Sequence, residues 1–369
     1  MHKKINAILI PVIMAALLTA FVVMPPKSFS ERENRYLAEA PRLSWRNIRS
    51  GAFMDEISDY VSDHFPLRDF WIGVNTRVSL LRGKTLVNGV YFAKDSYLIE
   101  KYEPSGNMTK LAKAVNSFAD KVEAKVTFMA VPTSVVINKD RLPAGTESDA
   151  DAQSAELKEL YGSLTCNTVD LTGVLFGVNK GGQAFYRLDH HWTSLGAIAA
   201  YEEYAGLLDA SSEKVFSLAE VSDSFRGTLF NKVGECGLGY DSIMSPELPE
   251  GLLDKVICKT DGGTDVPVFD ESKLETADQY AYFLSGNHPF LTITNTANEG
   301  CPDILVIKDS YANSMIPLML LDYHTVTVID PRYYGDVISS YVNANGIDEV
   351  LFVYNMNTLG TDLGIRRVQ

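Results

Sequence analysis

Residues 304–329 read ILVIKDSYANSMIPLMLLDYHTVTVI, and they carry the clearest fold signal of the chain. The apolar run from Ile304 to Ile307 predicts a buried strand, Met315 to Leu321 a helix, and Thr325 to Ile329 a second strand. Short apolar strands that alternate with helices are typical of a mostly parallel sheet covered by helices on both faces. The stretch therefore predicts an α/β fold.

The same alternation continues on both sides of this stretch. Toward the C-terminus, the pattern predicts a helix over Val337 to Asn343 and a last strand over Val350 to Tyr354. Toward the N-terminus it predicts a strand over Val126 to Val131 and helices over 53–61, 70–81, 111–122, 155–164 and 194–208. Residues 209–302 are rich in Gly, Asp and Ser and lack long periodic runs, so we expect an irregular insertion or irregular β structure there.

A hydrophobic segment near the N-terminus predicts where in the cell the protein is located. Lys3 and Lys4 precede Ile5 to Met24, a segment without charge that at about 1.5 Å per residue spans roughly 30 Å of hydrocarbon. The basic flank predicts a single-pass anchor in the cell membrane with the rest of the chain outside the cytoplasm. A cleaved signal peptide and a secreted protein are the alternative, but no clear small-x-small site precedes Pro25.

The chain then divides into three parts. We expect an anchor or signal segment at 1–25, a juxtamembrane helical segment at 26–85 and the α/β domain at 86–369.

Composition excludes several classes of function. The net charge of −14 argues against nucleic acid as a partner, because phosphate binding needs clustered Lys and Arg. No Gly-x-Gly-x-x-Gly or Walker loop is present, so no nucleotide cofactor is expected. The cysteines, Cys166, Cys236, Cys258 and Cys301, lack Cys-x-x-Cys spacing, which argues against a zinc site of that kind. An exported chain can form disulfides, so a Cys236–Cys258 pair stays open beside free thiols.

The run Asp189-His190-His191-Trp192 is the strongest chemical signal, since two of only six histidines are adjacent here. Histidine suits the role of a base near neutral pH, and a neighbouring carboxylate can orient its ring. A serine hydroxyl needs such a base to become a nucleophile. Ser310 directly follows the predicted strand at 304–307, so we expect Ser310 as nucleophile, His191 as base and Asp189 as the orienting acid.

Other polar residues fall at the same predicted edge of the sheet. In parallel sheets, ligands bind beyond the carboxyl ends of the strands, where Ser310, Arg332 and Asn355 are expected. Amides at the start of the helix after Ser310, or the turn at 286–288, are candidate oxyanion donors. The candidate substrate-binding residues are Arg332, Trp192, Tyr311, Asn313 and His190.

Structural roles compete with these assignments. Ser310 alone could be a helix N-cap, Arg332 a member of a surface ion pair, and Trp192 a packing residue. The Asp189–His191 run could also hold a metal ion with His64, His288 or a carboxylate. The catalytic interpretation is favoured over the metal site because the other histidines show no ligand spacing. We therefore expect neither metal nor cofactor.

The chain resembles the DHHW-type proteins of bacteria, which are related to the AlgJ/AlgX-like, SGNH-hydrolase-like proteins of exopolysaccharide O-acetylation. The resemblance rests on the 189–192 run, the later Asp309-Ser310-Tyr311, and shorter matches at 33–38, 65–68, 131–133 and 329–334. It implies an SGNH-hydrolase-like, flavodoxin-like three-layer sandwich in which the Asp-x-His pair precedes the serine. Asp189 and His191 match that pair, Ser310 matches the nucleophile, and His190 occupies the x position.

The resemblance also implies a function. It predicts an acyltransferase or acetylesterase that acts on acetyl groups of cell-surface polysaccharide, beside a multi-pass membrane acyltransferase that supplies the acetyl donor. A polysaccharide-binding or assembly protein that has kept the fold and lost turnover is the alternative, because function belongs to the site and not to the fold. No carbohydrate-binding module is expected after the last predicted strand.

Overall fold

A computed structural model describes residues 2–30, 35–206, 216–362 and 364–368, without the side chains of 2–10, 29, 35 and 367. The chain forms two compact units. One comprises Met1–Lys84 with Phe230–Leu238, and the other comprises Thr85–Leu229 with Gly239–Gln369. All the predicted catalytic and substrate-binding residues belong to the second, larger unit.

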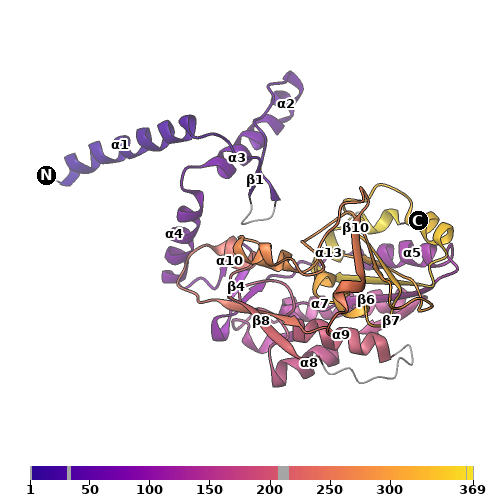
Figure 1. The fold of residues 1–369 in the computed structure, drawn as a ribbon. Coiled ribbons are helices and arrows are strands. Elements are labelled where there is room, and N and C mark those ends of the chain that lie inside the picture. The colour runs from indigo at the N-terminus through magenta and orange to yellow at the C-terminus, as the bar shows by residue number, and fades with distance from the viewer. Residues whose placement is uncertain (1, 31–34, 207–215, 363, 369) are drawn as a thin grey trace. The chain divides into compact units, whose positions relative to one another are not determined.

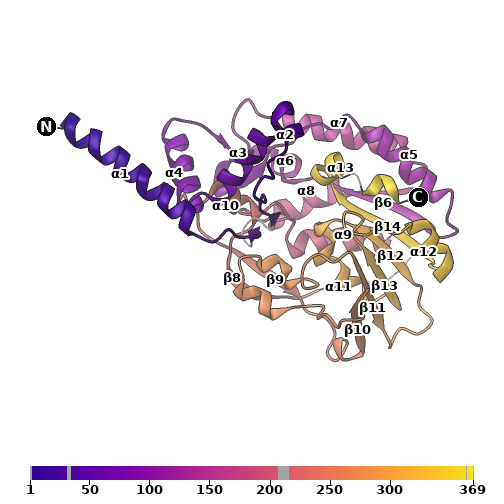
Figure 2. The same ribbon diagram turned by 90° about the horizontal axis from the view of Figure 1, so that it is seen from above.

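A seven-stranded sheet forms the centre of the larger unit, as Figures 1 and 2 show. Its strand order is β10-β11-β13-β12-β14-β6-β7. Neighbouring strands run parallel from β13 through β7, whereas β10 and β11 are antiparallel. The strands are β6 (Lys125–Val131), β7 (Asn167–Asp170), β10 (Val256–Thr260), β11 (Phe290–Asn295), β12 (Ile304–Lys308), β13 (Thr325–Ile329) and β14 (Glu349–Asn355). The prediction of a mostly parallel sheet is confirmed.

Two strands of the seven-stranded sheet, β10 and β11, come from residues 209–302, where we expected irregular structure. In β11, buried Leu291 and Ile293 alternate with threonines that are only half-buried. In β10, only Cys258 is buried, because this strand lies at the edge of the sheet. Such short, half-polar strands lack the continuous apolar run that marked the central strands.

Smaller sheets and helices complete the fold. A three-stranded sheet joins β3 (Leu86–Val87), β4 (Val90–Phe92) and β5 (Leu98–Glu100), and a pair joins β8 (Leu218–Phe225) to β9 (Asp241–Pro246). The helices of the larger unit include α5 (Met108–Ala119), α6 (Ser134–Ile137), α7 (Ser148–Ser163), α8 (Thr172–Gly181), α9 (Ser194–Gly206), α11 (Ile316–Met319), α12 (Ile338–Asn345) and α13 (Met356–Thr361). The division between the two units falls within helix α10 (Thr228–Val233).

The helices of the larger unit pack against one another. Helix α5 contacts α7 and the short 3₁₀ turn Ile365–Arg367, and α9 contacts α8 and α11. In α5, Met108, Leu111, Val115 and Phe118 recur at helical spacing and are fully buried. Such an apolar stripe fixes which side of a helix faces the sheet.

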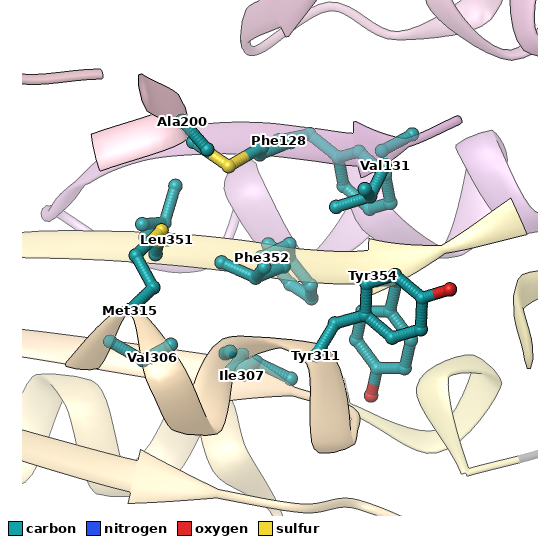
Figure 3. Packing of buried hydrophobic residues seen from close by; sticks show 14 of the residues in the cluster. Phe128, Val131, Ala200, Val306, Ile307, Tyr311, Met315, Leu351, Phe352 and Tyr354 are labelled. Atoms are coloured by element: carbon teal, nitrogen blue, oxygen red, sulfur yellow. The ribbon is translucent and has the colours of Figure 1, made fainter. Parts of the chain in front are cut away.

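Aromatic packing ties the central strands to this helix layer. Phe128 of β6 and Phe352 of β14 stack with ring centroids 5.4 Å apart, and Phe118 meets Phe352 edge-on at 5.4 Å. Figure 3 shows these strands with Tyr311 and Met315 on the turn that follows β12. Burying each of these phenylalanines contributes roughly 1.5–3 kcal/mol. The carboxyl end of β12 therefore emerges from a tightly packed part of the core.

The predicted helix at 315–321 is shorter than expected. After β12 the chain forms a 3₁₀ turn at Ser310–Ser314, followed by α11 over Ile316–Met319. Pro317 lies in the first turn of α11, where its missing N–H costs no helical hydrogen bond. Ser310 is therefore on a 3₁₀ turn, and not on an α-helix.

The smaller unit contains the helices expected at 53–61 and 70–81. Its elements are α1 (His2–Val23), β1 (Phe29–Ser30), β2 (Arg35–Tyr36), α2 (Trp45–Ser50), α3 (Ala52–His64) and α4 (Arg68–Leu81). At the end of α3, Asp63 accepts the amide of Ala38 at 2.8 Å, and His64 Nε2 lies 3.0 Å from the Ala38 carbonyl oxygen. His64 thus has a structural partner. Part of the expected 33–38 match, residues 33 and 34, lies outside the described residues.

The expected membrane anchor needs correction. No helix among the described residues combines the length and apolar character needed to cross a bilayer. The prediction of a single-pass protein of the cell membrane is therefore wrong.

The cysteines form no disulfide. Cys258 is buried in β10, Cys166 and Cys236 are half-buried, and Cys301 is exposed. The Cys236–Cys258 pair that the sequence left open does not form.

Candidate active site

Ser310 is held at the carboxyl end of β12 by the residue before it. The Asp309 carboxylate accepts a hydrogen bond from the Tyr311 amide at 2.9 Å. It also accepts hydrogen bonds from the backbone and side-chain nitrogens of Asn355, at 2.8 Å and 2.7 Å. Asn355 ends β14, so these bonds join the carboxyl ends of two neighbouring strands. Burial raises the pKa of Asp309, although the positive charge of Arg332 opposes this shift.

The Asp-His-His-Trp run forms the tip of a narrow loop between α8 and α9. Phe185 and Trp192 form an antiparallel bridge, and the Thr193 amide donates to the Ala184 carbonyl at 2.9 Å. The Trp192 indole N–H reaches the Tyr311 carbonyl at 2.9 Å and Ser314 Oγ at 3.0 Å. Trp192 therefore fastens the histidine loop to the serine turn.

This fastening brings the three predicted catalytic residues into one chain of hydrogen bonds. Ser310 Oγ lies 2.8 Å from His191 Nε2, and His191 Nδ1 lies 2.8 Å from Asp189 Oδ2. Asp189 and His191 are buried, whereas Ser310 is half-buried. Because the ionised Asp189 only accepts, Nδ1 carries the proton and Nε2 is left to accept the serine hydroxyl.

Electrostatics favour this protonation state. Burial opposes the charge of Asp189, but the histidine charges of His191 and His190 and their hydrogen bonds hold the pKa of Asp189 well below its usual range. Burial, with the positive charge of His190, lowers the pKa of His191 to about 4, although Asp189 opposes this. His191 is therefore neutral at pH 7, as a general base must be.

Two backbone groups behind Asp189 were not anticipated from the sequence. The Thr228 amide donates to Asp189 Oδ1 at 3.1 Å, beside the His190 amide at 2.6 Å. A Cβ at Gly227 would lie only 2.3 Å from Asp189 Cβ and Cγ, so this position must be glycine for the carboxylate to approach. A single glycine in a stretch with many glycines gives no signal of this role.

Tyr280 is a further neighbour that the sequence did not reveal. Its ring stacks on the His191 imidazole, with centroids 3.7 Å apart and planes 11° from parallel. Its hydroxyl contacts the Tyr311 carbonyl at 3.3 Å and Ser314 Oγ at 3.1 Å. The stacking restricts the imidazole plane, and no local motif marks Tyr280 for this position.

The predicted substrate-binding residues fall into two groups. Trp192, Tyr311 and Asn313 are at most 1% exposed, so the first two act here as packing and hydrogen-bonding groups, with the Tyr311 hydroxyl donating to the His190 carbonyl. The side chains of His190 and Arg332 are partly exposed, at 23% and 28%. Arg332 pairs with Asp330 through two bonds of 2.9 Å and 2.6 Å. Of these five residues, only His190 and Arg332 thus have partly exposed side chains.

A polar cluster adjoins the serine turn. Lys308, the last residue of β12, donates to Asn313 Oδ1 at 2.6 Å and to Asn287 Oδ1 at 3.0 Å. Asn313 Nδ2 in turn lies 3.3 Å from both the Gly286 carbonyl oxygen and Asn287 Oδ1. The turn at 286–288, a candidate oxyanion donor from the sequence, is therefore linked to the turn that bears Ser310.

Asp189, His190 and His191 could also hold a metal ion, since their ligand atoms lie within 4.8 Å of one another. Both ring nitrogens of His191 already face protein groups, Asp189 and Ser310. His288, a further candidate ligand, lies 3.0 Å from the Leu284 carbonyl oxygen through Nε2. The arrangement fits a hydrogen-bonded base better than a metal ligand set.

A model of a known protein family matches part of the chain. Residues 91–233 match the family model of the SGNH hydrolase-like domain of the acetyltransferase AlgX, a range that includes Asp189 and His191. No protein with a curated description matches the chain by sequence.

The solved structures of a DHHW family protein and of PatB1 share the fold. A DHHW family protein from Eubacterium siraeum is 21% identical, with a TM-score of 0.63 over 76% of this chain and 96% of its own. Bacillus cereus PatB1, in a structure that carries a sulfonyl adduct, is 18% identical, with a TM-score of 0.60 over 76% of this chain and 98% of its own. The O-acetyltransferase domain of Pseudomonas putida AlgJ is 14% identical, with a TM-score of 0.47 over 74% and 93%. The predicted resemblance and the SGNH-like α/β fold are confirmed.

Proposed function

We propose that this chain is an SGNH-type acyltransferase or esterase that moves acetyl groups of polysaccharide through a covalent intermediate on Ser310. The observation that carries the proposal is the hydrogen-bond chain from Ser310 Oγ through His191 to Asp189, with both links at 2.8 Å. A hydroxyl, a neutral imidazole and a buried carboxylate in this order are the parts that nucleophilic acyl transfer requires.

In the first half-reaction, Ser310 Oγ attacks the carbonyl carbon of an acetyl ester while His191 Nε2 takes the hydroxyl proton. The tetrahedral intermediate collapses when the bond to the leaving oxygen breaks, and His191 returns the proton to that oxygen. The acetyl group then remains on Ser310 as an ester. Asp189 stays ionised and stabilises the transient imidazolium of His191.

The developing oxyanion needs hydrogen-bond donors. The Tyr311 amide is already used by Asp309, so the Ser310 amide is the donor that the 3₁₀ turn can offer. The side-chain amide of Asn287 is the second donor that we propose. Its oxygen faces Lys308 and Asn313, which leaves its exposed NH₂ group for a ligand.

In the second half-reaction, a sugar hydroxyl attacks the acetyl-serine while His191 takes its proton, and the acetyl group passes to the sugar. Water in place of the sugar would give acetate. The match to the AlgX acetyltransferase domain supports a polysaccharide acceptor. We further propose that a partner acyltransferase supplies the acetyl donor and that His190 and Arg332 contact the substrate, because their side chains are partly exposed.

Two assays test the proposal. Because PatB1 carries a sulfonyl adduct in a related fold, a phenylmethylsulfonyl fluoride probe is suitable. We expect the adduct on the Ser310 peptide by mass spectrometry, and acetate release from 4-nitrophenyl acetate by the wild type. Ser310→Ala and His191→Ala should each lower turnover by at least about 10³-fold.

His324→Ala is the matched control. His324 Nδ1 lies 3.1 Å from Asp303, so it repeats a His-Asp pair at the opposite end of the parallel strands, away from Ser310. This variant should keep wild-type turnover. A folded wild type that takes no adduct and releases no acetate, yet binds polysaccharide, would replace the proposal with the binding protein.

A further inference from the structure

Lys308 is an unusual feature of the site, because its ammonium group is buried directly beside the proposed nucleophile. The residue is 1% exposed, and its Nζ donates to Asn313 Oδ1 at 2.6 Å and to Asn287 Oδ1 at 3.0 Å. An ammonium has three donors and no acceptor, so it can contact only the oxygen of a carboxamide. Both asparagines must therefore direct their oxygens to Lys308 and their NH₂ groups elsewhere.

The two NH₂ groups have different surroundings. Asn313 Nδ2 is used by the Gly286 carbonyl and Asn287 Oδ1, both at 3.3 Å. Asn287 Nδ2 has no hydrogen-bond partner within the described residues, and Asn287 is exposed. Side chains three apart in a 3₁₀ turn project to the same side, so Asn313 lies on the side of Ser310. Asn287, bonded to Asn313, is thereby placed near that side as well.

We propose that Lys308 is a positioning residue that holds the Asn287 carboxamide with its NH₂ group toward the acyl oxygen on Ser310. This role rests on the proposed function. Without the ammonium, the Asn287 amide could turn by half a rotation and present its oxygen, which would repel an oxyanion. Burying the Lys308 ammonium costs desolvation free energy that an apolar side chain at this position would not cost. The presence of a lysine here therefore supports a role other than stabilising the fold.

The charged groups around Lys308 set how pH would act on it. The carboxylates of Asp309 and Asp330 attract the ammonium, the Arg332 guanidinium repels it, and His191 and His288 feel its charge. Burial lowers the pKa of Lys308 to about 8, despite the opposing charge of Asp330. The ammonium is thus present at neutral pH and is lost as pH rises through about 8.

A double-mutant cycle on ester turnover tests the assignment. We expect Lys308→Met and Asn287→Ala each to lower kcat on 4-nitrophenyl acetate by about 10²-fold or more, with little change in KM, as loss of one oxyanion donor does. The double variant should be no slower than Asn287→Ala alone, because both changes remove the same donor. Lys259→Met, at an exposed lysine, should match the wild type.

Wild-type pH profiles provide a second readout that does not depend on the stability of Lys308→Met. Wild-type kcat should fall as pH rises through about 8, and Asn287→Ala should lack this alkaline decline. The assignment of Lys308 would be overturned if Lys308→Met kept the kcat of the wild type. It would also be overturned if Lys308→Met slowed turnover equally in the presence and absence of the Asn287 side chain. Either result would leave the proposed function standing. A wild type with no Ser310-dependent turnover would instead overturn the proposed function, and this assignment with it.

Discussion

The charge state of His191 is the residue-level property on which the proposed chemistry depends. Burial lowers the pKa of His191 to about 4, below the usual value near 6.5. Since a general base acts only when deprotonated, kcat/KM for the acetyl ester should stay constant from pH 7 to about 5 and decline as pH falls through about 4. A pH-rate profile with buffer-matched blanks measures this, and a decline centred near 6.5 would contradict it.

The same shift affects stability. Between about pH 6.5 and 4, His191 is protonated in the unfolded chain but neutral in the folded protein. The free energy of unfolding therefore decreases as pH falls through this range. Circular dichroism at each pH therefore has to accompany the rate profile, so that lost activity is not mistaken for unfolding.

Gly227 leads to a second residue-level prediction. In Gly227→Ala, the new methyl group would lie 2.3 Å from Asp189 Cβ and Cγ, so the carboxylate must move away from His191. A displacement on the order of 1 Å can cost about 10²-fold, and we expect at least that loss in kcat. Gly177→Ala is the control, because a Cβ there meets no atom within 4 Å. Equal kcat in the two variants would show that Asp189 tolerates the shift.

At the level of elements, Asn355 joins two strands and a helix. Its Nδ2 donates to Asp309 at 2.7 Å and to Thr358 Oγ1 at 2.7 Å, while its Oδ1 accepts two amides at the start of α13. Asn355→Ala removes a helix cap and a bond to a buried carboxylate, which we expect to cost about 2–4 kcal/mol of unfolding free energy. Urea denaturation measures this.

Loss of the Asn355 side chain should also displace Ser310, because Asp309, which Asn355 holds, caps the 3₁₀ turn that begins with Ser310. We therefore expect kcat to fall in the Asn355→Ala protein under native conditions. Asn343→Ala, which removes one exposed bond to the Lys121 carbonyl, is the matched control and should change the unfolding free energy by less than about 0.5 kcal/mol. A cost as small as this at Asn355 would show that β12 and β14 do not rely on it.

At the scale of the whole molecule, the sequence predicts the parts that local patterns encode. The buried parallel strands carry continuous apolar runs, and helices such as α5 carry one apolar stripe, so both could be read from spacing. The approach of Ser310 to His191 and Asp189 could be expected from sequence, because a serine after a strand and an Asp-x-His pair are complementary hydrogen-bonding groups. The antiparallel strands β10 and β11 were missed because half-buried strands need only an alternating pattern.

The supporting residues of the site could not be predicted, because their roles exist only after folding. Gly227, Tyr280 and Lys308 act through contacts with residues distant in the chain, and none belongs to a local motif. The buried state of Trp192 likewise follows from its bond to the Tyr311 carbonyl, 119 residues away.

The strand order has a consequence for synthesis of the chain. The last strand, β14, lies in the middle of the sheet, between β12 and β6. Until a ribosome has released residues 349–355, β6 and β12 each have an unpaired edge, and such edges can pair with other chains. The sheet therefore cannot close until β14 has emerged, and the newborn chain is most prone to aggregate just before that point.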